Sequence, residues 1–274
     1  MIGQARSAAE ALRPLNIRYS STEVTVLVAN ELWSAAEQLR EQFQASAWAA
    51  AAPADGEGNA VEPVELAARF LKFCVAQLPG QPAGLPWMEL AQLLFKHFCE
   101  TFLRGNDVHA ATESLEAPVR RDVINAYYSA QVLLADAGLD VSAAPAPALF
   151  GCVERGEAAL FAVFGGQGNV EEYFDETQEV FDTYEPLVRD FAEQMSALLK
   201  RAARTPQAQT VCSKGLDIMR WLASPDARPD LPYLLSVPIS LPIVGFTQLL
   251  HVLVLCRATG RTPGEVAALF KGAT

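Results

Sequence analysis

The sequence is poor in positive charge, and this shortage excludes one class of partner. Its 274 residues contain 21 Lys and Arg against 32 Asp and Glu, which gives a formal net charge of −11. No run of basic residues forms a local positive patch in the sequence. Because a chain of this charge repels a nucleic-acid backbone, we expect no nucleic-acid partner.

Cysteine and histidine are also scarce, with five and three residues. The cysteines are far apart and show no C-x-x-C spacing, a pattern that indicates reduced thiols in an intracellular protein. The first 16 residues lack the apolar core of a signal peptide. We therefore expect a cytoplasmic protein without disulfides and without a metal site.

Formal charge is absent from residues 234–256, a stretch of 23 residues that is long enough to span a bilayer. However, the stretch contains Pro238 and Pro242, and two prolines this close interrupt a spanning helix. We therefore predict a buried strand over 233–237, a turn, a buried helix over 242–257 and no membrane partner.

The first part of the chain shows mostly helical periodicity. Residues 23–28 (EVTVLV) are rich in β-branched side chains and predict one early strand. Apolar stripes then predict helices over 30–45, 63–78, 86–103 and 118–136. The proline-spaced segment 143–148 (AAPAPA) has no periodic face, and we place the domain boundary there. Residues 1–150 are thus predicted to form a helix-rich N-terminal module.

The pattern changes after this boundary. Residues 158–164 (AALFAVF) form a continuous apolar run, which is typical of a strand buried on both faces of a parallel sheet. A glycine-rich loop over 165–169 follows, and acidic residues then open a helix, where their charge is favourable. Further helices are predicted up to Arg204, with a break at Pro186, and over 214–222. This order predicts a mixed α/β, helix-rich fold, with the first part of an α/β domain over 151–274.

The loop GGQGN, residues 165–169, could bring backbone N–H groups close to an anion. A dinucleotide fingerprint requires a third glycine, and a P-loop requires a lysine and a hydroxyl after its last glycine. Neither pattern is present. Two interpretations remain open from the residues alone, an oxyanion-binding loop and a tight turn with a structural role.

Several phrases of the sequence carry a resemblance to one family. They are FLRGNDVH (102–109), AVFGGQGNVEEYFDE (162–176), KGLDIMRWL (214–222), YLLSVPISLP (233–242) and FKGAT (270–274). In order and spacing they resemble the fungal-type fatty acid synthase β subunit from about residue 23 to residue 274. FKGAT is similar to the lead-in to that family's nucleophile motif, Gly-His-Ser-Gln-Gly.

The resemblance implies a malonyl/acetyl-transferase-like domain, in which a serine takes an acetyl group from coenzyme A and passes it to the acyl carrier protein. A histidine activates the serine, and backbone N–H groups bind the oxyanion. The resemblance places the N–H of Gln167 in this oxyanion hole, and Gly166, Gly168 and Ser240 in the substrate-binding site. The serine and the catalytic histidine are expected beyond Thr274, so we expect the isolated chain to be inactive.

The resemblance also implies partners, namely the acyl carrier protein, the remaining domains of the β subunit and the α subunit in a large multienzyme assembly. It implies acetyl-CoA as substrate and no cofactor bound by this segment, since FMN and NADPH belong to other domains of the complex. Two alternatives stay open. The chain could be a structural module of a megasynthase without chemistry of its own, or part of a specialised synthase that makes a short acyl starter for a polyketide.

Three groups of polar residues allow a functional and a structural interpretation. His251 and Gln248 lie three positions apart on an apolar helix; they could face a substrate channel, but a polar contact within the core is favoured. His97 and Cys99 lack metal-ligand partners in the sequence, which favours core packing. The acidic cluster over 171–176 could suggest a metal site, but a solvated helix start is favoured.

Overall fold

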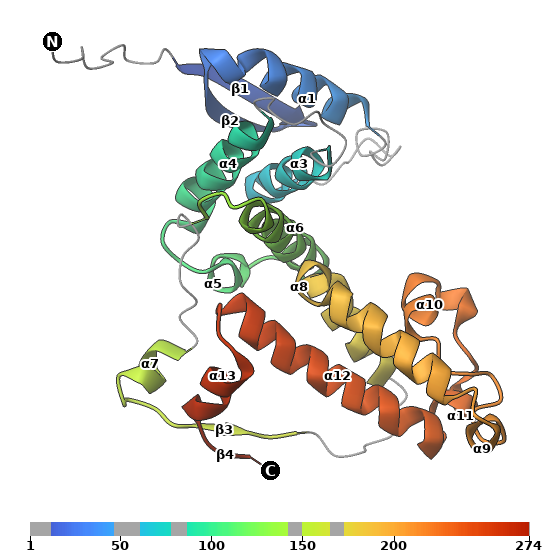
Figure 1. The fold of residues 1–274 in the computed structure, drawn as a ribbon. Helices are drawn as coiled ribbons and strands as arrows, with labels where there is room; N and C mark the ends of the chain where they lie inside the picture. The colour runs from blue at the N-terminus through green and yellow to red at the C-terminus, as the bar shows by residue number, and fades with distance from the viewer. Residues whose placement is uncertain (1–11, 47–60, 78–86, 142–149, 165–172, 274) are drawn as a thin grey trace, which may run out of the picture. The chain divides into compact units, whose positions relative to one another are not determined.

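The computed structural model describes residues 12–46, 61–77, 87–141, 150–164 and 173–273. Its contacts divide the chain into two compact units, residues 1–145 and 146–274. The described residues are mainly helical, with four short strands (Figure 1), so the prediction of a helix-rich fold is confirmed. The proline-spaced segment 143–148, on which the domain boundary was placed, lies outside the described residues.

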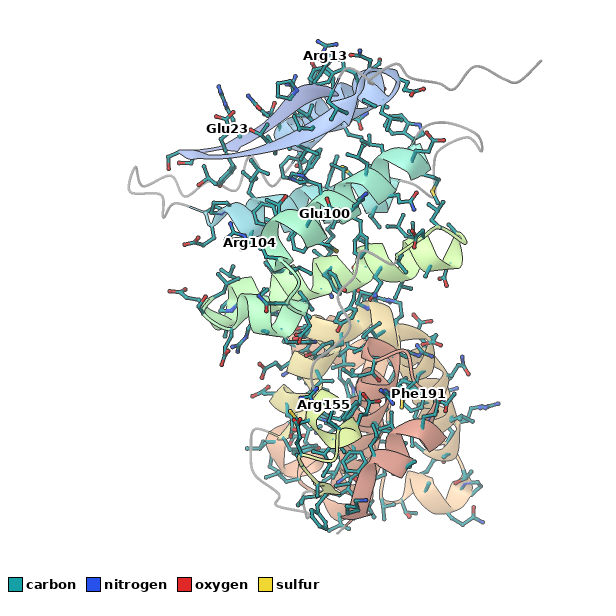
Figure 2. The ribbon with its side chains drawn as sticks, turned by 90° about the vertical axis from the view of Figure 1, so that its left-hand side faces the viewer. Arg13, Glu23, Glu100, Arg104, Arg155 and Phe191 are labelled. Carbon is teal, nitrogen blue, oxygen red and sulfur yellow. The ribbon has the colours of Figure 1, made fainter. Side chains whose placement is uncertain are left out.

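The first unit opens with an antiparallel hairpin of β1 (Leu12–Tyr19) and β2 (Thr22–Ala29). The valines of β2 alternate with the exposed residues Glu23, Thr25 and Leu27 and are buried on one face. The predicted strand over 23–28 is confirmed, whereas its partner β1 was not predicted. Figure 2 labels Arg13 and Glu23 on this hairpin, and the Arg13 guanidinium lies 3.9 Å from the centre of the Trp33 ring.

Helices cover the buried face of the hairpin and form the core of the first unit. They are η1 (Asn30–Leu32), α1 (Trp33–Ala45), α3 (Pro63–Gln77), α4 (Trp87–Phe98), the π-helix η3 (Cys99–Leu103), α5 (Val108–Thr112) and α6 (Ala117–Asp136). The four predicted helices are confirmed, and within the described residues of this unit the five-residue α5 is additional. Asp107 caps α5 by accepting hydrogen bonds from the backbone N–H groups of His109 and Ala110.

The second unit is arranged around two long helices, α8 and α12. Its elements are α7 (Gly151–Glu154), β3 (Leu160–Ala162), α8 (Tyr173–Ala202), α9 (Pro206–Gln209), α10 (Ile218–Ala223), η5 (Pro225–Ala227), α11 (Leu231–Leu234), α12 (Val237–Ala258), α13 (Pro263–Leu269) and β4 (Phe270–Ala273). Helix α8 is kinked at Tyr184, whose backbone is not helical, two residues before Pro186. The predicted break at this proline is therefore confirmed as a kink.

Helices α8 and α12 are held together by both apolar and polar contacts. The buried hydroxyls of Thr177 and Thr247 lie 2.6 Å apart. Phe191, labelled in Figure 2, stacks on Phe246 with ring centres 6.2 Å apart. Arg257 donates to the Asp190 carboxylate at 2.6 and 2.9 Å, and these hydrogen bonds hold the pKa of Asp190 below its usual value.

For the second unit, one prediction is wrong and another is confirmed only in part. Residues 233–237 are not a strand but contain the end of α11, a two-residue connection and the start of α12, because Pro232 and Pro238 occupy first-turn positions, where a missing N–H costs little. The strand predicted over 158–164 is reduced to Leu160–Ala162 and is not buried on both faces. Phe161 is 64% exposed and Val163 is 74% exposed.

Helix α12 is long and apolar enough to cross a membrane by length and composition, with a mean hydropathy of 2.0 over its most apolar window. Core helices also pass this test, and α12 buries several side chains, among them Ile239, Ile243, Phe246 and Leu250. These residues lie one helical turn apart or close to it, so one stripe of α12 faces the core of the second unit. Packing against α8 therefore accounts for the apolar residues of this stripe, whereas Val237, Leu241 and Leu249 of α12 are exposed.

Candidate functional site

Strands β3 and β4 form a parallel pair at the edge of the second unit. Leu160 is paired with Phe270 and Ala162 with Ala273, with an irregularity after Leu160. Both strands are anchored by an apolar cluster that buries Phe150, Cys256 and Val266, against which Leu160 and Phe270 pack. Because the strands are parallel, their carboxyl ends lie at the same edge, where ligands bind in open α/β folds.

A hollow of about 730 Å³, which we call the strand-end hollow, opens beside this pair of strands. Helices α12 and α13 form its other walls, and Glu176 reaches it from the start of α8. The lining residues are Phe161, Ala162, Val163, Phe164, Glu176, Gln248, His251, Val252, Leu255, Pro263, Val266, Ala267, Phe270, Lys271, Gly272 and Ala273. Its volume is in the range of small-molecule sites.

The walls of this hollow are mostly apolar. Phe161 and Phe164 come from β3 and the residues after it, Phe270 comes from β4, and Leu255 comes from α12. Phe161 and Phe164 are both largely exposed in the structure. Such a surface suits the hydrocarbon part of a ligand, because burying apolar area there is favourable. Phe161 and Phe164 were predicted only as strand residues, without a role in a site.

One histidine brings ionisable chemistry to the hollow. His251 Nδ1–H donates to the carbonyl oxygen of Thr247 at 3.0 Å. This bond leaves Nε2 directed to the other side, where the Glu176 carboxylate lies 3.7 Å away. In the neutral ring Nε2 accepts hydrogen bonds. His251 can therefore accept a hydrogen bond at the edge of the hollow.

This arrangement corrects one interpretation of the sequence. The pair His251 and Gln248 was expected to make a polar contact within the core, but His251 is 47% exposed and both residues line the hollow. The spacing of three residues correctly put both on one face of a helix, but it does not show what that face meets. Glu176 was not predicted to join them, because its position depends on how α8 packs on α12.

The structure leaves the predicted site residues untested. Gly166, Gln167 and Gly168 lie outside the described residues, although Phe164, just before them, lines the hollow. Ser240 is 1% exposed on α12 and is not among the lining residues of the hollow. Its Oγ has no hydrogen-bond partner among the described residues. The roles of these four residues stay predictions.

The remaining polar candidates have structural roles in the described parts of the chain. No group of three His, Cys, Asp or Glu residues there could hold a metal ion. Cys99 is buried, and burial raises the pKa of its thiol to about 12, so its prediction as a core residue is confirmed. In the acidic cluster, Asp175 and Glu176 are largely exposed at the first turn of α8, as expected of a solvated helix start.

Comparison with known proteins identifies relatives over nearly the whole chain. Residues 11–134 match a family described as the N-terminal domain in fatty acid synthase subunit beta. The chain is 34% identical to the fatty acid synthase subunit beta of Saccharomyces cerevisiae over 97% of its length, and 33% identical to that of Schizosaccharomyces pombe over 99%. A fatty acid synthase beta subunit of Cochliobolus carbonum is 32% identical over 97% of the chain.

The matched region is a small part of these relatives, since the chain spans 13% of the length of each of the three. The match includes both structural units, because an alignment over 97% to 99% of the chain cannot leave out either of them. The resemblance seen in the sequence is therefore confirmed. This chain belongs to the family of fungal fatty acid synthase β subunits and corresponds to their N-terminal region.

Proposed function

We propose that residues 151–274 are the first part of an acyltransferase domain. The complete domain would move an acetyl or other starter acyl group from coenzyme A to the acyl carrier protein through an acyl-serine intermediate. The parallel pairing of β3 and β4 is the observation that supports this most strongly. Strand β3 precedes the glycine–glutamine loop, and strand β4 precedes the expected nucleophile motif. Because the two strands are parallel, they end at the same edge of the sheet.

The proposed reaction needs a nucleophile, a base and an oxyanion hole at that edge. The serine oxygen would attack the thioester carbonyl, and the negative charge that develops on the carbonyl oxygen would be met by the N–H of Gln167. Coenzyme A would leave as the thiol, and the acyl group would then pass to the thiol of the carrier protein. In this scheme the apolar walls of the strand-end hollow, such as Phe161 and Phe270, would contact the acyl chain.

His251 is a candidate for a positioning role in this scheme. The catalytic histidine is expected after the serine, beyond Thr274, so His251 is not assigned as the base. Its Nε2 lies at the edge of the hollow, where it could bind a polar group of the substrate. The acyl carrier protein, the α subunit and the other domains of the β subunit are the proposed partners, in a cytoplasmic multienzyme assembly.

A pair of Gln167 variants tests the proposed function in the complete β subunit assembled with its partners. Gln167→Pro removes the backbone donor, and loss of one such donor typically lowers turnover by roughly 10²–10³. Gln167→Ala keeps the N–H and should lower turnover far less. The measurement is the rate at which radiolabelled acetyl groups from acetyl-CoA become covalently bound to the protein.

Two controls make the outcome decisive. Thermal melting shows whether each variant folds, and the isolated 274-residue chain, which is expected to lack the serine, should acquire no label. A Gln167→Pro variant that melts like the wild type and is acetylated at the wild-type rate would rule out the oxyanion role. Covalent labelling of the isolated chain would show that the nucleophile is not where the resemblance places it.

A further inference from the structure

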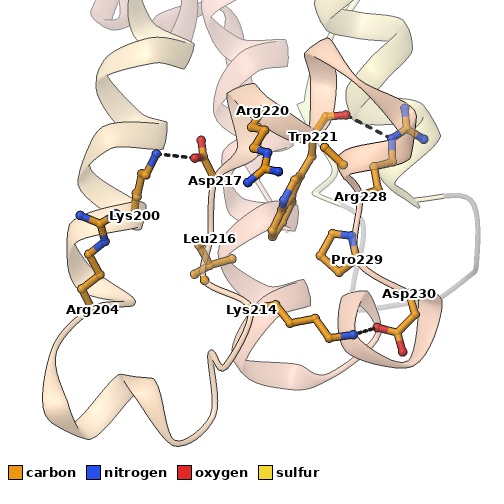
Figure 3. A pocket seen from close by; sticks show the side chains of 12 residues that line it. Lys200, Arg204, Lys214, Leu216, Asp217, Arg220, Trp221, Arg228, Pro229 and Asp230 are labelled. Atoms are coloured by element: carbon orange, nitrogen blue, oxygen red, sulfur yellow. Dashed lines mark hydrogen bonds and ion pairs between the residues drawn. The ribbon is translucent and has the colours of Figure 1, made fainter.

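A second hollow in the same unit has a different chemistry. It encloses about 600 Å³ between the end of α8, α10 and the segment that leads to α11 (Figure 3), and we call it the basic hollow. Its lining residues are Lys200, Arg204, Lys214, Gly215, Leu216, Asp217, Arg220, Trp221, Ala227, Arg228, Pro229 and Asp230. None of these residues lines the strand-end hollow.

The charge of this hollow is opposite to that of the chain. Five of its lining residues are Lys or Arg and two are Asp, which leaves three positive charges (five minus two) in a protein with a net charge of −11. Like charges brought together in this way repel one another unless an anion lies between them. The segment over 200–230 therefore concentrates positive potential that the rest of the sequence does not share.

Three of the five cations are held by partners. Lys200 pairs with Asp217, and Lys214 pairs with Asp230, whose pKa is held below its usual value by this hydrogen bond. Arg228 donates to Gln178 at 2.8 Å and to Asp175 at 3.3 Å. These contacts fix the walls of the hollow, because they join α8 to both sides of α10.

Arg204 and Arg220 are different from the other three. Neither makes an ion pair or a side-chain hydrogen bond with the parts of the chain that the structure describes, and Figure 3 draws both guanidiniums without a partner. Each guanidinium offers five N–H donors in a planar arrangement that matches two oxygens of a phosphate. Two such groups on one hollow can bind an anion that carries more than one negative charge.

Part of the lining of the hollow is apolar. Leu216, Trp221 and Pro229 supply this part, although Trp221 and Leu216 are only 3% and 4% exposed. Trp221 is itself held by Phe174, with ring centres 6.2 Å apart. A ligand that consisted of phosphate alone would leave this apolar wall unused, and the volume is within the range of sites for small organic molecules.

We propose that the basic hollow binds a small organic phosphate, in which one or two phosphoryl groups are attached to a compact aromatic body, as in a nucleoside diphosphate. Arg204 and Arg220 bind the phosphoryl oxygens, and the wall of Leu216, Trp221 and Pro229 contacts the aromatic body. This inference does not depend on the proposed acyl transfer, since the two hollows share no residue.

Calorimetric titration of the 274-residue chain with ADP, pyrophosphate and adenosine tests the proposal, at about 50 mM salt, where charge–charge contacts are weakly screened. ADP should bind most tightly, pyrophosphate more weakly and adenosine weakest. The double variant Arg204→Gln/Arg220→Gln should bind ADP at least about tenfold more weakly, because hydrogen bonds between charged groups are lost. Arg201→Gln removes one positive charge from the last turn of α8 but none from the hollow, and should change affinity by less than about twofold.

Each result supports or overturns the proposal. Equal losses in the Arg201 and Arg204/Arg220 variants would show that general charge attracts the anion, and equal affinity for ADP and adenosine would exclude phosphoryl recognition. Failure of the wild-type chain to bind ADP at about 5 mM would overturn the site. Tighter binding of a phosphoserine peptide than of ADP would show that the partner is another protein.

Thermal melting of each variant controls for folding. If the glutamine double variant unfolds at a lower temperature, Arg204→Lys/Arg220→Lys replaces it. Because lysine keeps the charge but cannot contact two phosphate oxygens in the same plane, this variant should still bind ADP several-fold more weakly, about threefold or more. Wild-type affinity in a folded lysine variant would contradict recognition by the guanidiniums.

Discussion

The two units of this chain differ in how they use their apolar residues. Ten large apolar side chains are 47% to 74% exposed in the described residues, and only two of them, Leu12 and Leu27, belong to the first unit. Eight belong to the second unit, and three of these lie within 161–164, next to the strand-end hollow. The first unit thus buries its apolar faces against itself, whereas the second leaves apolar surface open at its candidate site.

Contacts distant in sequence join the helices of both units, and in the first unit Lys72 donates to Asn125 at 2.7 Å between α3 and α6. In the second unit, contacts distant in sequence join its helices, such as Thr177 to Thr247 and Arg257 to Asp190. In the first unit, the aromatic core around Phe95 and Tyr127 joins α4 to α6, with ring centres 5.6 Å apart. The two units therefore differ in how much apolar surface they leave exposed, and the second offers surfaces suited to ligands.

A matched pair of phenylalanine truncations should show this difference most strongly. Phe95 is 1% exposed in the first unit, and Phe95→Ala should lower the free energy of unfolding by about 3–5 kcal/mol through lost contacts and a cavity. Phe161 is exposed beside the strand-end hollow, and Phe161→Ala should cost less than about 0.5 kcal/mol. Hydrogen exchange of the full chain in increasing urea reports each unit separately.

Of the two variants, Phe161→Ala gives the stricter test of the difference between the units. A loss of several kcal/mol on Phe161→Ala would mean that β3 is covered in solution and that the strand-end hollow is closed. Equal losses in the two variants would contradict the difference between the units. Phe43, buried in α1 of the first unit, provides a second core position where truncation should resemble that of Phe95.

The same difference explains which elements could be predicted from the sequence. The helices of the first unit carry regular apolar stripes, and these stripes face a core within the same unit, so periodicity alone finds them. Strand β1 was missed because Arg13, Pro14 and Arg18 interrupt its apolar pattern. Only the pairing with β2 makes it a strand.

Prediction was weaker in the second unit because its apolar runs have little periodicity. Residues 233–237 are a short apolar run, which fits a buried strand or a buried helix equally well. The positions of Pro232 and Pro238 favour two helices over a strand, since each proline fits the first turn of a helix. The meeting of His251 with Glu176 could not be predicted, because it depends on the packing of α8 on α12.

Buried hydroxyls allow a second and smaller comparison of the units. Thr177 and Thr247 bridge two helices in the second unit, so Thr177→Val removes a contact between elements and should cost about 1–3 kcal/mol. Thr112 in the first unit bonds only within its own helix, to the carbonyl oxygens of Val108 at 2.7 Å and His109 at 3.4 Å. Thr112→Val should cost less, about 1 kcal/mol or below, because no partner from another element is left unpaired.

Urea unfolding of the full chain measures both threonine variants, and the double variant Thr177→Val/Thr247→Val supplies the control. With both hydroxyls removed, no buried group is left unpaired at this contact, so the double variant should cost less than the sum of the two single changes. Strict additivity would show that the two hydroxyls do not depend on each other. A larger loss for Thr112→Val than for Thr177→Val would reverse the expected order of the two units.

The smallest expected difference between the two units is in how their stability responds to low pH. Burial lowers the pKa of His109 in the first unit below its ordinary value of 6.5, although the nearby Asp107 opposes this shift, and burial also lowers the pKa of His97. A histidine whose pKa is lowered by folding contributes stability that is fully present above pH 6.5 and is lost as the pH falls through the folded-state pKa. In the second unit, hydrogen bonding from Arg257 lowers the pKa of Asp190 below 3.8. The stability that this ion pair contributes is therefore lost only in stronger acid.

Acidification from about pH 7.5 to about pH 5.5 should therefore destabilise the first unit before the second, since this interval includes the titration of histidine but not of Asp190. His109→Gln should remove part of the loss, less than about 1 kcal/mol, because the side chain is only partly buried. The glutamine also loses the contact of His109 with Tyr128, 3.1 Å long, which lowers stability equally at both pH values.

Hydrogen exchange in urea, corrected for the intrinsic effect of pH, measures the change in each unit. His251→Gln, which alters an exposed histidine of the second unit, should leave the acid sensitivity of the first unit unchanged. If the second unit loses stability first over this interval, the buried histidines do not control the response of this chain to acid.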